Sequence, residues 1–319
     1  MKKVLNWVVL FCVSLSVFGG SLEPSGPPAG TMKPLDQVEP RIAITSVPLT
    51  ISQSGSYYLT KNLTATDTAI TIIADDVTID FCGFTLTGPG TIGYGIFMNG
   101  RKNVEVRNGT IKNFGWHGIS EAAVNSGQHH RVVNMRILSC GNCGIYLSGN
   151  GHMIKDCAVS GIHAPSGGYI TALSAGSACI ITGNAICNNG TSAAAGSDVA
   201  GINAGNGCTI IGNVVSNNGT SGAGMVYGIS VGNACVVNDN SVYLNGNNST
   251  GSSVRGIYAS GYTKVVGNCV YNNGTGSSAT RYGIYLGGYN FVDQNIAYSN
   301  GTNMNSSATG CVIGQNVAP

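Results

Sequence analysis

All five histidines of the chain lie between residues 117 and 163, together with acidic and basic side chains. The longer stretch that follows, residues 164–319, has only six charged side chains. Imidazoles ionise near neutral pH and bind metals readily, so histidines beside a carboxylate could form an acid/base site or a weak metal site. The alternative is a solvated face without chemistry. The candidate catalytic residues are His117, Glu121, His129, His130, Arg131, His152 and Asp156.

Tyrosines form a second candidate set, because they recur at regular intervals. Tyr243, Tyr271 and Tyr298 are separated by 28 and 27 residues. Stacked surface tyrosines offer flat apolar faces with a polar rim, which suit sugar rings, although the same stacking could serve only to stabilise a sheet. A second, broken column comprises Phe97, Tyr146, Tyr258 and Tyr285. The predicted ligand-binding residues are Tyr243, Tyr271, Tyr298, Tyr258 and Tyr285.

The cysteines also follow a pattern. Cys179, Cys208 and Cys235 each lie five residues before a recurrent asparagine. This spacing places them in one inward column, either as buried thiols that pack as small apolar groups or as a disulfide between stacked positions. Cys140 and Cys143 form a lone Cys-x-x-Cys without a second pair, so zinc is not expected. We predict no cofactor and no dedicated metal site.

These residues are set on a repeat of short strands and turns. Gly-Ile, or Tyr-Ile in the longest gap, recurs at intervals of 23 to 32 residues, with asparagines at fixed offsets behind it. A period near 27 without helical periodicity excludes helical repeats. Leucine-rich repeats are excluded by the missing leucine frame, and propeller blades need about 40 residues or more. The pattern indicates a β coil in which equivalent residues stack at about 4.8 Å.

Each recurrent residue then has a structural role. The asparagines are expected at turns, where a buried amide can bond backbone groups of neighbouring coils, and glycine after asparagine permits positive φ. The isoleucines are expected to form an inward ladder that excludes water. That ladder comprises Ile96, Ile119, Ile145, Ile170, Ile202, Ile229, Ile257 and Ile284.

The Gly-Ile and Asn frame over residues 69–319 resembles the right-handed parallel β-helix repeat superfamily of secreted bacterial proteins, the broad group with pectate-lyase-like folds. Residues 31–41 and 76–80 resemble the N-terminal region of many members. The resemblance implies an all-β fold, a single-stranded right-handed parallel β-helix of about nine to ten rungs of about 27 residues.

Members that cleave polysaccharides use paired carboxylates for hydrolysis, or an Arg or Lys base with calcium for elimination. Of the pectin-hydrolase motifs only His117-Gly118 is present here, and the calcium-binding aspartate cluster of pectate lyases is absent from the sequence. The resemblance therefore leaves open whether the protein is an enzyme; if it is one, a polysaccharide lyase or a glycoside hydrolase is expected.

The N-terminus is typical of an exported protein. Lys2 and Lys3 precede an apolar run from Val4 to Phe18, and small residues follow, so residues 1–20 are predicted to be a cleaved signal peptide. The five prolines in residues 21–40 indicate an extended leader that caps the β-helix of residues 41–319. We expect a secreted, periplasmic or cell-surface protein without a transmembrane segment after cleavage.

The net charge and the predicted export limit the classes of partner that the protein can bind. Removing Lys2 and Lys3 leaves thirteen basic against thirteen acidic residues, which gives no electrostatic basis for binding nucleic acid. The leading hypothesis is binding, with processing as a further option, of an extracellular polysaccharide or cell-surface glycan. The alternative is a non-catalytic structural or adhesive cell-surface protein, whose regular solenoid is itself the function.

Overall fold

Parallel strands joined by tight turns make up the computed structural model, which describes residues 40–121, 127–164, 168–191, 196–220, 223–305 and 308–319. The predicted signal peptide and nearly all of the leader lie outside the described residues. Residues 41–319 form one unit with its own core. Among the described residues, no helix has the length and apolarity that a bilayer crossing requires.

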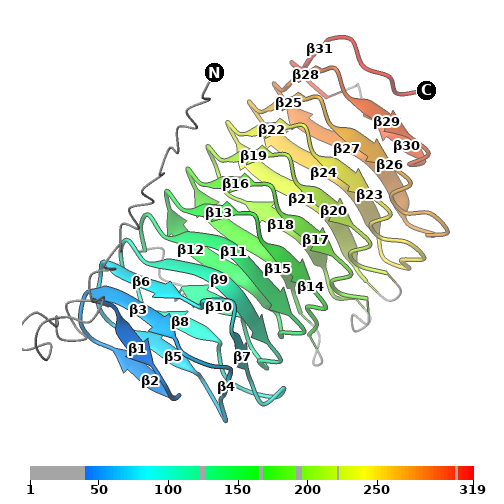
Figure 1. Ribbon diagram of the computed structural model, residues 1–319. Coiled ribbons are helices and arrows are strands. Elements are labelled where there is room, and N and C mark those ends of the chain that lie inside the picture. Colours follow the sequence, from blue (N-terminus) through cyan, green and yellow to red (C-terminus); the bar gives the residue numbers. More distant parts are fainter. Residues whose placement is uncertain (1–39, 122–126, 165–167, 192–195, 221–222, 306–307) are drawn as a thin grey trace, which may run out of the picture. The chain divides into compact units, whose positions relative to one another are not determined.

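The chain winds into a coil in which each turn adds strands to two parallel sheets (Figure 1). In the described part of the chain, one sheet has eleven strands and the other has twenty. A typical coil gives one long strand to the first sheet and two short strands to the second. For example, β15 (Ile170–Ser177) pairs with β18 (Val199–Ala204), while β16 (Ile180–Thr182) pairs with β19 (Thr209–Ile211). The predicted β-helix is confirmed.

The eleven-stranded sheet runs in chain order along the coil. Its strands are β2 (Leu49–Ile51), β5 (Ile70–Ile72), β8 (Ile96–Met98), β10 (Ile119–Glu121), β12 (Cys143–Asn150), β15, β18, β21 (Met225–Asn233), β24 (Ser253–Gly261), β27 (Thr280–Gly288) and β30 (Thr302–Met304).

The twenty-stranded sheet contains the remaining strands. They are β1 (Ile42–Ile44), β3 (Gly55–Leu59), β4 (Leu63–Thr64), β6 (Val77–Asp80), β7 (Thr85–Thr87), β9 (Glu105–Lys112), β11 (Arg131–Leu138), β13 (Met153–Lys155), β14 (Ala158–Ser160), β16, β17 (Ala185–Cys187), β19, β20 (Val214–Ser216), β22 (Val236–Asn238), β23 (Ser241–Tyr243), β25 (Lys264–Val266), β26 (Cys269–Tyr271), β28 (Phe291–Asp293), β29 (Ile296–Tyr298) and β31 (Val312–Ile313).

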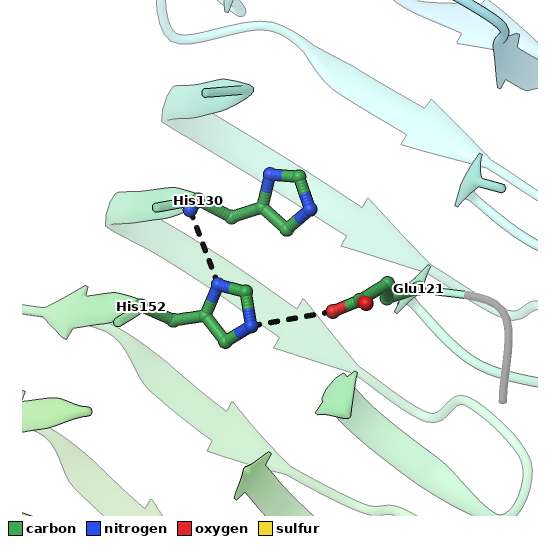
Figure 2. A group of neighbouring side chains, drawn as sticks. All are labelled: Glu121, His130 and His152. Carbon is green, nitrogen blue, oxygen red and sulfur yellow. Dashed lines mark hydrogen bonds and ion pairs between the residues drawn. The ribbon is translucent and has the colours of Figure 1, made fainter. Parts of the chain in front are cut away.

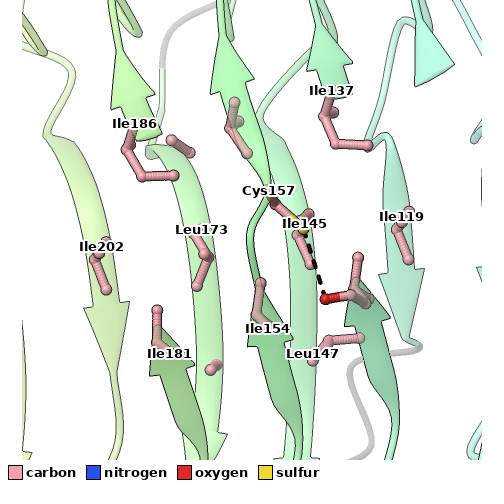
Figure 3. Close-up of a cluster of buried hydrophobic side chains, with 14 of the residues drawn as sticks. Ile119, Ile137, Ile145, Leu147, Ile154, Cys157, Leu173, Ile181, Ile186 and Ile202 are labelled. Atoms are coloured by element: carbon pink, nitrogen blue, oxygen red, sulfur yellow. Dashed lines mark hydrogen bonds between the residues drawn. The ribbon is translucent and has the colours of Figure 1, made fainter. Parts of the chain in front are cut away.

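The predicted isoleucine ladder is present, with one correction. Ile96, Ile119 and Ile145 stack in register, and all three are fully buried. In the next coil the partner of Ile145 is Leu173 (Figure 3). Ile170 pairs instead with Val199. The Gly-Ile frame identified the wrong residue here because this coil carries Tyr-Ile three residues earlier. Leu173 fills the ladder position equally well, because a buried leucine excludes water as an isoleucine does.

From Asn184 onward, two ladders of buried asparagines close the turns, as the sequence predicted. The earlier recurrent positions, such as Asn134, lie instead at positive-φ turns outside these ladders. Asn213 shows the pattern: its side-chain amide donates to Oδ1 of Asn240 at 3.0 Å and to the backbone oxygen of Ile181 at 3.0 Å. Its own backbone N–H also donates to Oδ1 of Asn240. No polar atom of the buried amide is left unpaired, which is what makes burial tolerable. Glycines such as Gly219, with φ of 64°, follow the second ladder, as expected.

Candidate functional site

His130 and His152 belong to a column of inward side chains, each of which accepts a hydrogen bond from the preceding coil. Nδ1 of His130 accepts from the backbone N–H of Val104 at 3.2 Å. Nδ1 of His152 accepts from the N–H of His130 at 3.1 Å. The N–H of His152 in turn donates to Sγ of Cys179 at 3.4 Å. The column continues through Cys208, Cys235, Thr263, Asn290 and Cys311.

The cysteine column therefore has a role beyond packing. Cys179, Cys208 and Cys235 are buried free thiols, in agreement with the inward placement read from the sequence. Each sulfur accepts a backbone N–H from the coil before it and lies near a carbonyl that its S–H can reach. In this column a thiol accepts a backbone N–H, as the hydroxyl of Thr263 and the amide oxygen of Asn290 do.

Glu121 projects into the same interior from the opposite sheet (Figure 2). One of its carboxylate oxygens accepts the N–H of Gly127 at 2.7 Å. The other accepts the N–H of Gly149 at 3.1 Å and lies 3.3 Å from Nε2 of His152. Burial alone would raise the pKa of Glu121, but the adjacent His152 imidazole and the N–H groups of the two glycines outweigh it and lower the pKa below its usual value.

The imidazole tautomers decide what this cluster can do. Ligand atoms of Glu121, His130 and His152 lie within 4.8 Å of one another, which is a metal-compatible spacing. However, both Nδ1 atoms already accept backbone N–H groups, so in a neutral ring the proton sits on Nε2. A metal-bound histidine normally donates from its other ring nitrogen, which these rings cannot do. The arrangement fits a buried carboxylate held by N–H donors better than a metal ion.

His130 stays neutral in this setting. Its burial, followed by the neighbouring His152, lowers its pKa to about 4. Nε2 of His130 has no hydrogen-bond partner among the described residues. All three side chains of the cluster are at most 1% exposed, so the cluster lies in the interior between the two sheets. We call Glu121, His130 and His152 the interior clasp.

The other predicted catalytic residues lie elsewhere. Arg131 points outward and pairs with Glu105 at 3.3 Å, since adjacent residues of a strand face opposite sides. Asp156 is at an exposed turn, 3.6 Å from Lys155. His129 also lies at a turn, with φ of 57°. His117 is on the outer face of the eleven-stranded sheet. The structure thus divides the predicted set among the interior, the outer faces and the turns.

A hollow of about 210 Å³ lies on that outer face beside His117. A second hollow of about 150 Å³ adjoins it and shares Tyr169, Thr171 and Asn203 with it. We call the two together the sheet groove. Its lining residues are His117, Asn142, Cys143, Tyr146, Tyr169, Thr171, Ser174, Ala200, Asn203, Tyr227 and Ser230.

Aromatic rings build one end of the sheet groove. His117 stacks on Tyr146, with ring centroids 5.5 Å apart, and contacts Tyr94 at 5.6 Å. Burial lowers the pKa of His117 to about 4, against a smaller opposing effect of its hydrogen bond to the backbone of Cys143. The ring is therefore neutral at pH 7. Trp116 lies 6.0 Å from Tyr94 at the same end.

The strand register extends the outer face of the eleven-stranded sheet from coil to coil. Tyr146 pairs with Ser174, and Ser174 pairs with Asn203. The same outward column continues through Ser230, Tyr258 and Tyr285. Tyr258 and Tyr285, predicted as ligand-binding residues, thus lie on the face that carries the sheet groove. Tyr169, Asn142 and Asn203 of the groove were not among the predicted site residues.

The other predicted tyrosines lie on the twenty-stranded sheet and do form a column. Tyr243 and Tyr271 stack at 4.8 Å with ring planes 5° apart, and Tyr271 and Tyr298 stack at 5.2 Å and 4°. Because neighbouring rings cover one another, the face of Tyr271 is occupied on both sides. Rims rather than ring faces are presented to solvent, which favours a stabilising role for this column.

No family model matches the chain, and no curated protein matches it. Among solved structures, the periplasmic alginate epimerase AlgG is similar at 11% identity and a TM-score of 0.50, over 87% of this chain and 77% of that one. The Dettilon tailspike protein aligns at 15% identity and a TM-score of 0.41, and this chain spans 60% of its length. The A-module of the Azotobacter vinelandii epimerase AlgE4 aligns at 13% and 0.39, over 86% and 88%. These similarities concern the fold alone.

Proposed function

We propose that the protein is exported and binds an extracellular polysaccharide along the outer face of its eleven-stranded sheet. The observation that carries this proposal is the sheet groove, which crosses successive coils from Tyr146 to Tyr227. A groove that runs across coils, instead of a closed pocket, suits a linear polymer.

The lining chemistry supports a sugar ligand. Tyr146, Tyr169 and Tyr227 supply ring faces that can contact the apolar C–H faces of pyranose rings. Asn142, Asn203 and the hydroxyls of Thr171 and Ser174 supply neutral donors and acceptors for sugar hydroxyls. Because coils repeat at about 4.8 Å, similar contacts recur at short regular intervals along a chain of repeated units.

Binding, and not hydrolysis, is the activity that these residues favour. Hydrolysis by paired carboxylates needs two acidic side chains in reach of one bond. The described lining of the sheet groove contains no Asp or Glu, and Glu121 is enclosed within the coil. The AlgG structure, an alginate epimerase with a similar fold, adds support for a polysaccharide as the ligand class.

Trp116 provides the test. The chain has two tryptophans, Trp7 and Trp116, and Trp7 lies in the predicted signal peptide. In the mature protein, titration with a panel of polysaccharides should therefore change the fluorescence of Trp116 alone. Tyr146→Ala should weaken binding about tenfold or more, while Tyr271→Ala on the other sheet serves as the matched control. A panel of neutral, acidic and sulfated polysaccharides that leaves the wild-type signal unchanged would refute the proposal.

The alternative function is a non-catalytic structural or adhesive protein. The observation in its favour is that many side chains stabilise the stacking of the coils, in the asparagine, cysteine and tyrosine ladders. This alternative predicts no saturable glycan binding and normal surface retention of the Tyr146→Ala variant. Saturable binding that Tyr146→Ala weakens would exclude a purely structural role.

A further inference from the structure

Arg255 lies at the far end of the face that carries the sheet groove, on β24. Its guanidinium carbon is 4.1 Å from the ring centroid of Tyr285, 5.0 Å from that of Tyr258 and 5.5 Å from that of Tyr227. One cation is thus surrounded by the rings of three successive strands, β21, β24 and β27. We call Arg255 with these tyrosines the arginine cradle.

The cation of the arginine cradle has no anionic partner. Among the described residues, no carboxylate lies within ion-pair distance of Arg255, and its Nε atom is buried without a hydrogen-bond partner. Ring faces attract the cation but do not accept its N–H groups. At Nε the guanidinium has therefore lost water and gained no acceptor in return.

A carboxylate on the same face, that of Asp198, is already engaged. Asp198 accepts the backbone N–H of Met225 at 2.7 Å, and it hydrogen-bonds the hydroxyl of Tyr169, whose pKa is raised as a result. Asp198 therefore fixes Tyr169 at the rim of the sheet groove and is not the partner of Arg255.

The arginine cradle is continuous with the sheet groove. Tyr227 lines the groove and also contacts Arg255. In the parallel register Thr171 pairs with Ala200, Ala200 with Tyr227, and Tyr227 with Arg255. The backbone of Arg255 is therefore three coils from Thr171, or roughly 14 Å at the usual strand spacing. A linear glycan in the groove would reach it.

From these observations we propose that the arginine cradle is an anion-binding subsite, which takes an acidic substituent of the bound glycan, a carboxylate or a sulfate group. The inference rests on the proposed glycan function and adds the chemical class of the ligand. The planar guanidinium can donate two parallel N–H groups to two oxygens of one anion. The surrounding rings hold its plane in place and keep water away, which strengthens the pairing.

Affinity measurements with two substitutions test the subsite. The wild type should bind uronate-containing or sulfated polysaccharides more tightly than neutral ones. Arg255→Gln should weaken the binding of acidic glycans about tenfold or more and the binding of neutral glycans less than about twofold. Arg255→Lys keeps the positive charge but lacks the planar guanidinium with its two parallel N–H donors. This variant should therefore bind acidic glycans more tightly than Arg255→Gln but less tightly than the wild type. Lys264→Gln removes the same charge from the twenty-stranded sheet and is the matched control.

A second measurement separates this inference from the proposed function. NMR signals of the arginine Nε–H groups are recorded while glucuronate, glucose 6-sulfate or glucose is added. A shift of the Arg255 signal with either acidic sugar, but not with glucose, supports the subsite and identifies the anion, even if no polysaccharide binds. If polysaccharides bind through Tyr146 while Arg255→Gln is without effect on acidic ones, the anion subsite is wrong and the glycan function stands. Absence of a shift with both acidic sugars also overturns the subsite.

Discussion

His130 donates its backbone N–H to Nδ1 of His152 at 3.1 Å, and the two imidazole rings stack at 4.9 Å with planes 6° apart. This hydrogen bond fixes the tautomer of His152, just as the N–H of Val104 fixes that of His130, and it leaves the proton of each neutral ring on Nε2. Nε2 of His152 lies 3.3 Å from Glu121. Histidines that look catalytic in the sequence are thus held as interior hydrogen-bonding groups (Figure 2).

Stability should depend on the acceptor at position 152. His152→Ala leaves the N–H of His130 unpaired, removes a donor from Glu121 and opens a cavity, so we expect a loss of about 3 to 5 kcal/mol in the free energy of unfolding. His152→Asn restores an acceptor of the kind that Asn290 supplies in the same column and should lose roughly half as much. Denaturant titration of both variants checks this. Equal stability of His152→Ala and the wild type would contradict the clasp.

Acid should destabilise the protein in a defined range. The pKa values of His117 and His130 are about 4 in the folded protein, below the usual 6.5. Between these values the unfolded chain binds more protons than the folded one, so stability is complete above pH 6.5 and falls as the pH drops toward 4. Each group contributes at most about 1.4 kcal/mol per pH unit.

Glu121 adds a second acid effect. Its pKa is lowered from 4.5, so its contribution is present above that pH and is lost as the pH falls further. Denaturation midpoints measured from pH 8 to pH 4 should show a plateau and then a decline that steepens near pH 4.5. His130→Asn should show a shallower decline between pH 6.5 and 4.5. A flat profile over that interval for the wild type would show that the buried imidazoles do not stay neutral.

Thiol labelling should distinguish the interior column from the surface. Cys179, Cys208 and Cys235 are buried free thiols, whereas Cys82 is exposed. We expect Ellman's reagent to label Cys82 in the folded protein and the column only after unfolding, and we expect reductant to leave the melting temperature unchanged. Peptide mass spectrometry that finds a Cys179 to Cys208 disulfide in the purified protein would be inconsistent with the column described above.

The tyrosine column on the twenty-stranded sheet should affect stability and not binding. Tyr271→Ala removes stacking against both Tyr243 and Tyr298, and should lower the free energy of unfolding by roughly 1 to 2 kcal/mol. Glycan affinity should stay within about twofold of wild type. A larger loss of affinity, with stability unchanged, would instead make this column the binding surface.

The sequence allowed much of the coil to be predicted because one frame recurs. Ile119 and Ile145 fall in register, and His130 and His152 share a column, because coils near that point have similar lengths. The frame gave Ile170 where the structure has Leu173, since the next coil places its ladder residue three positions later. Local motifs cannot detect such an offset, which depends on how a whole coil closes.

The site was harder to predict than the fold. A one-residue difference sends His130 inward and Arg131 outward, so a cluster in sequence becomes separate sites in space. The sheet groove brings together Tyr146, Tyr169 and Asn203 from three coils. Their outward alignment follows from the strand register, which the sequence pattern predicted for Tyr146 but not for the longer coils after it.

Photo-cross-linking tests the central claim most directly. An oligosaccharide that binds the mature protein is prepared with a photoreactive group, and its complex with the protein is irradiated. Peptide mass spectrometry then identifies the peptides to which the oligosaccharide has become attached. We expect attachment to peptides that carry sheet groove residues, such as Tyr146, Tyr169, Asn203 and Tyr227. Attachment confined to the stacked tyrosines of the twenty-stranded sheet, with none in the sheet groove, would contradict the account.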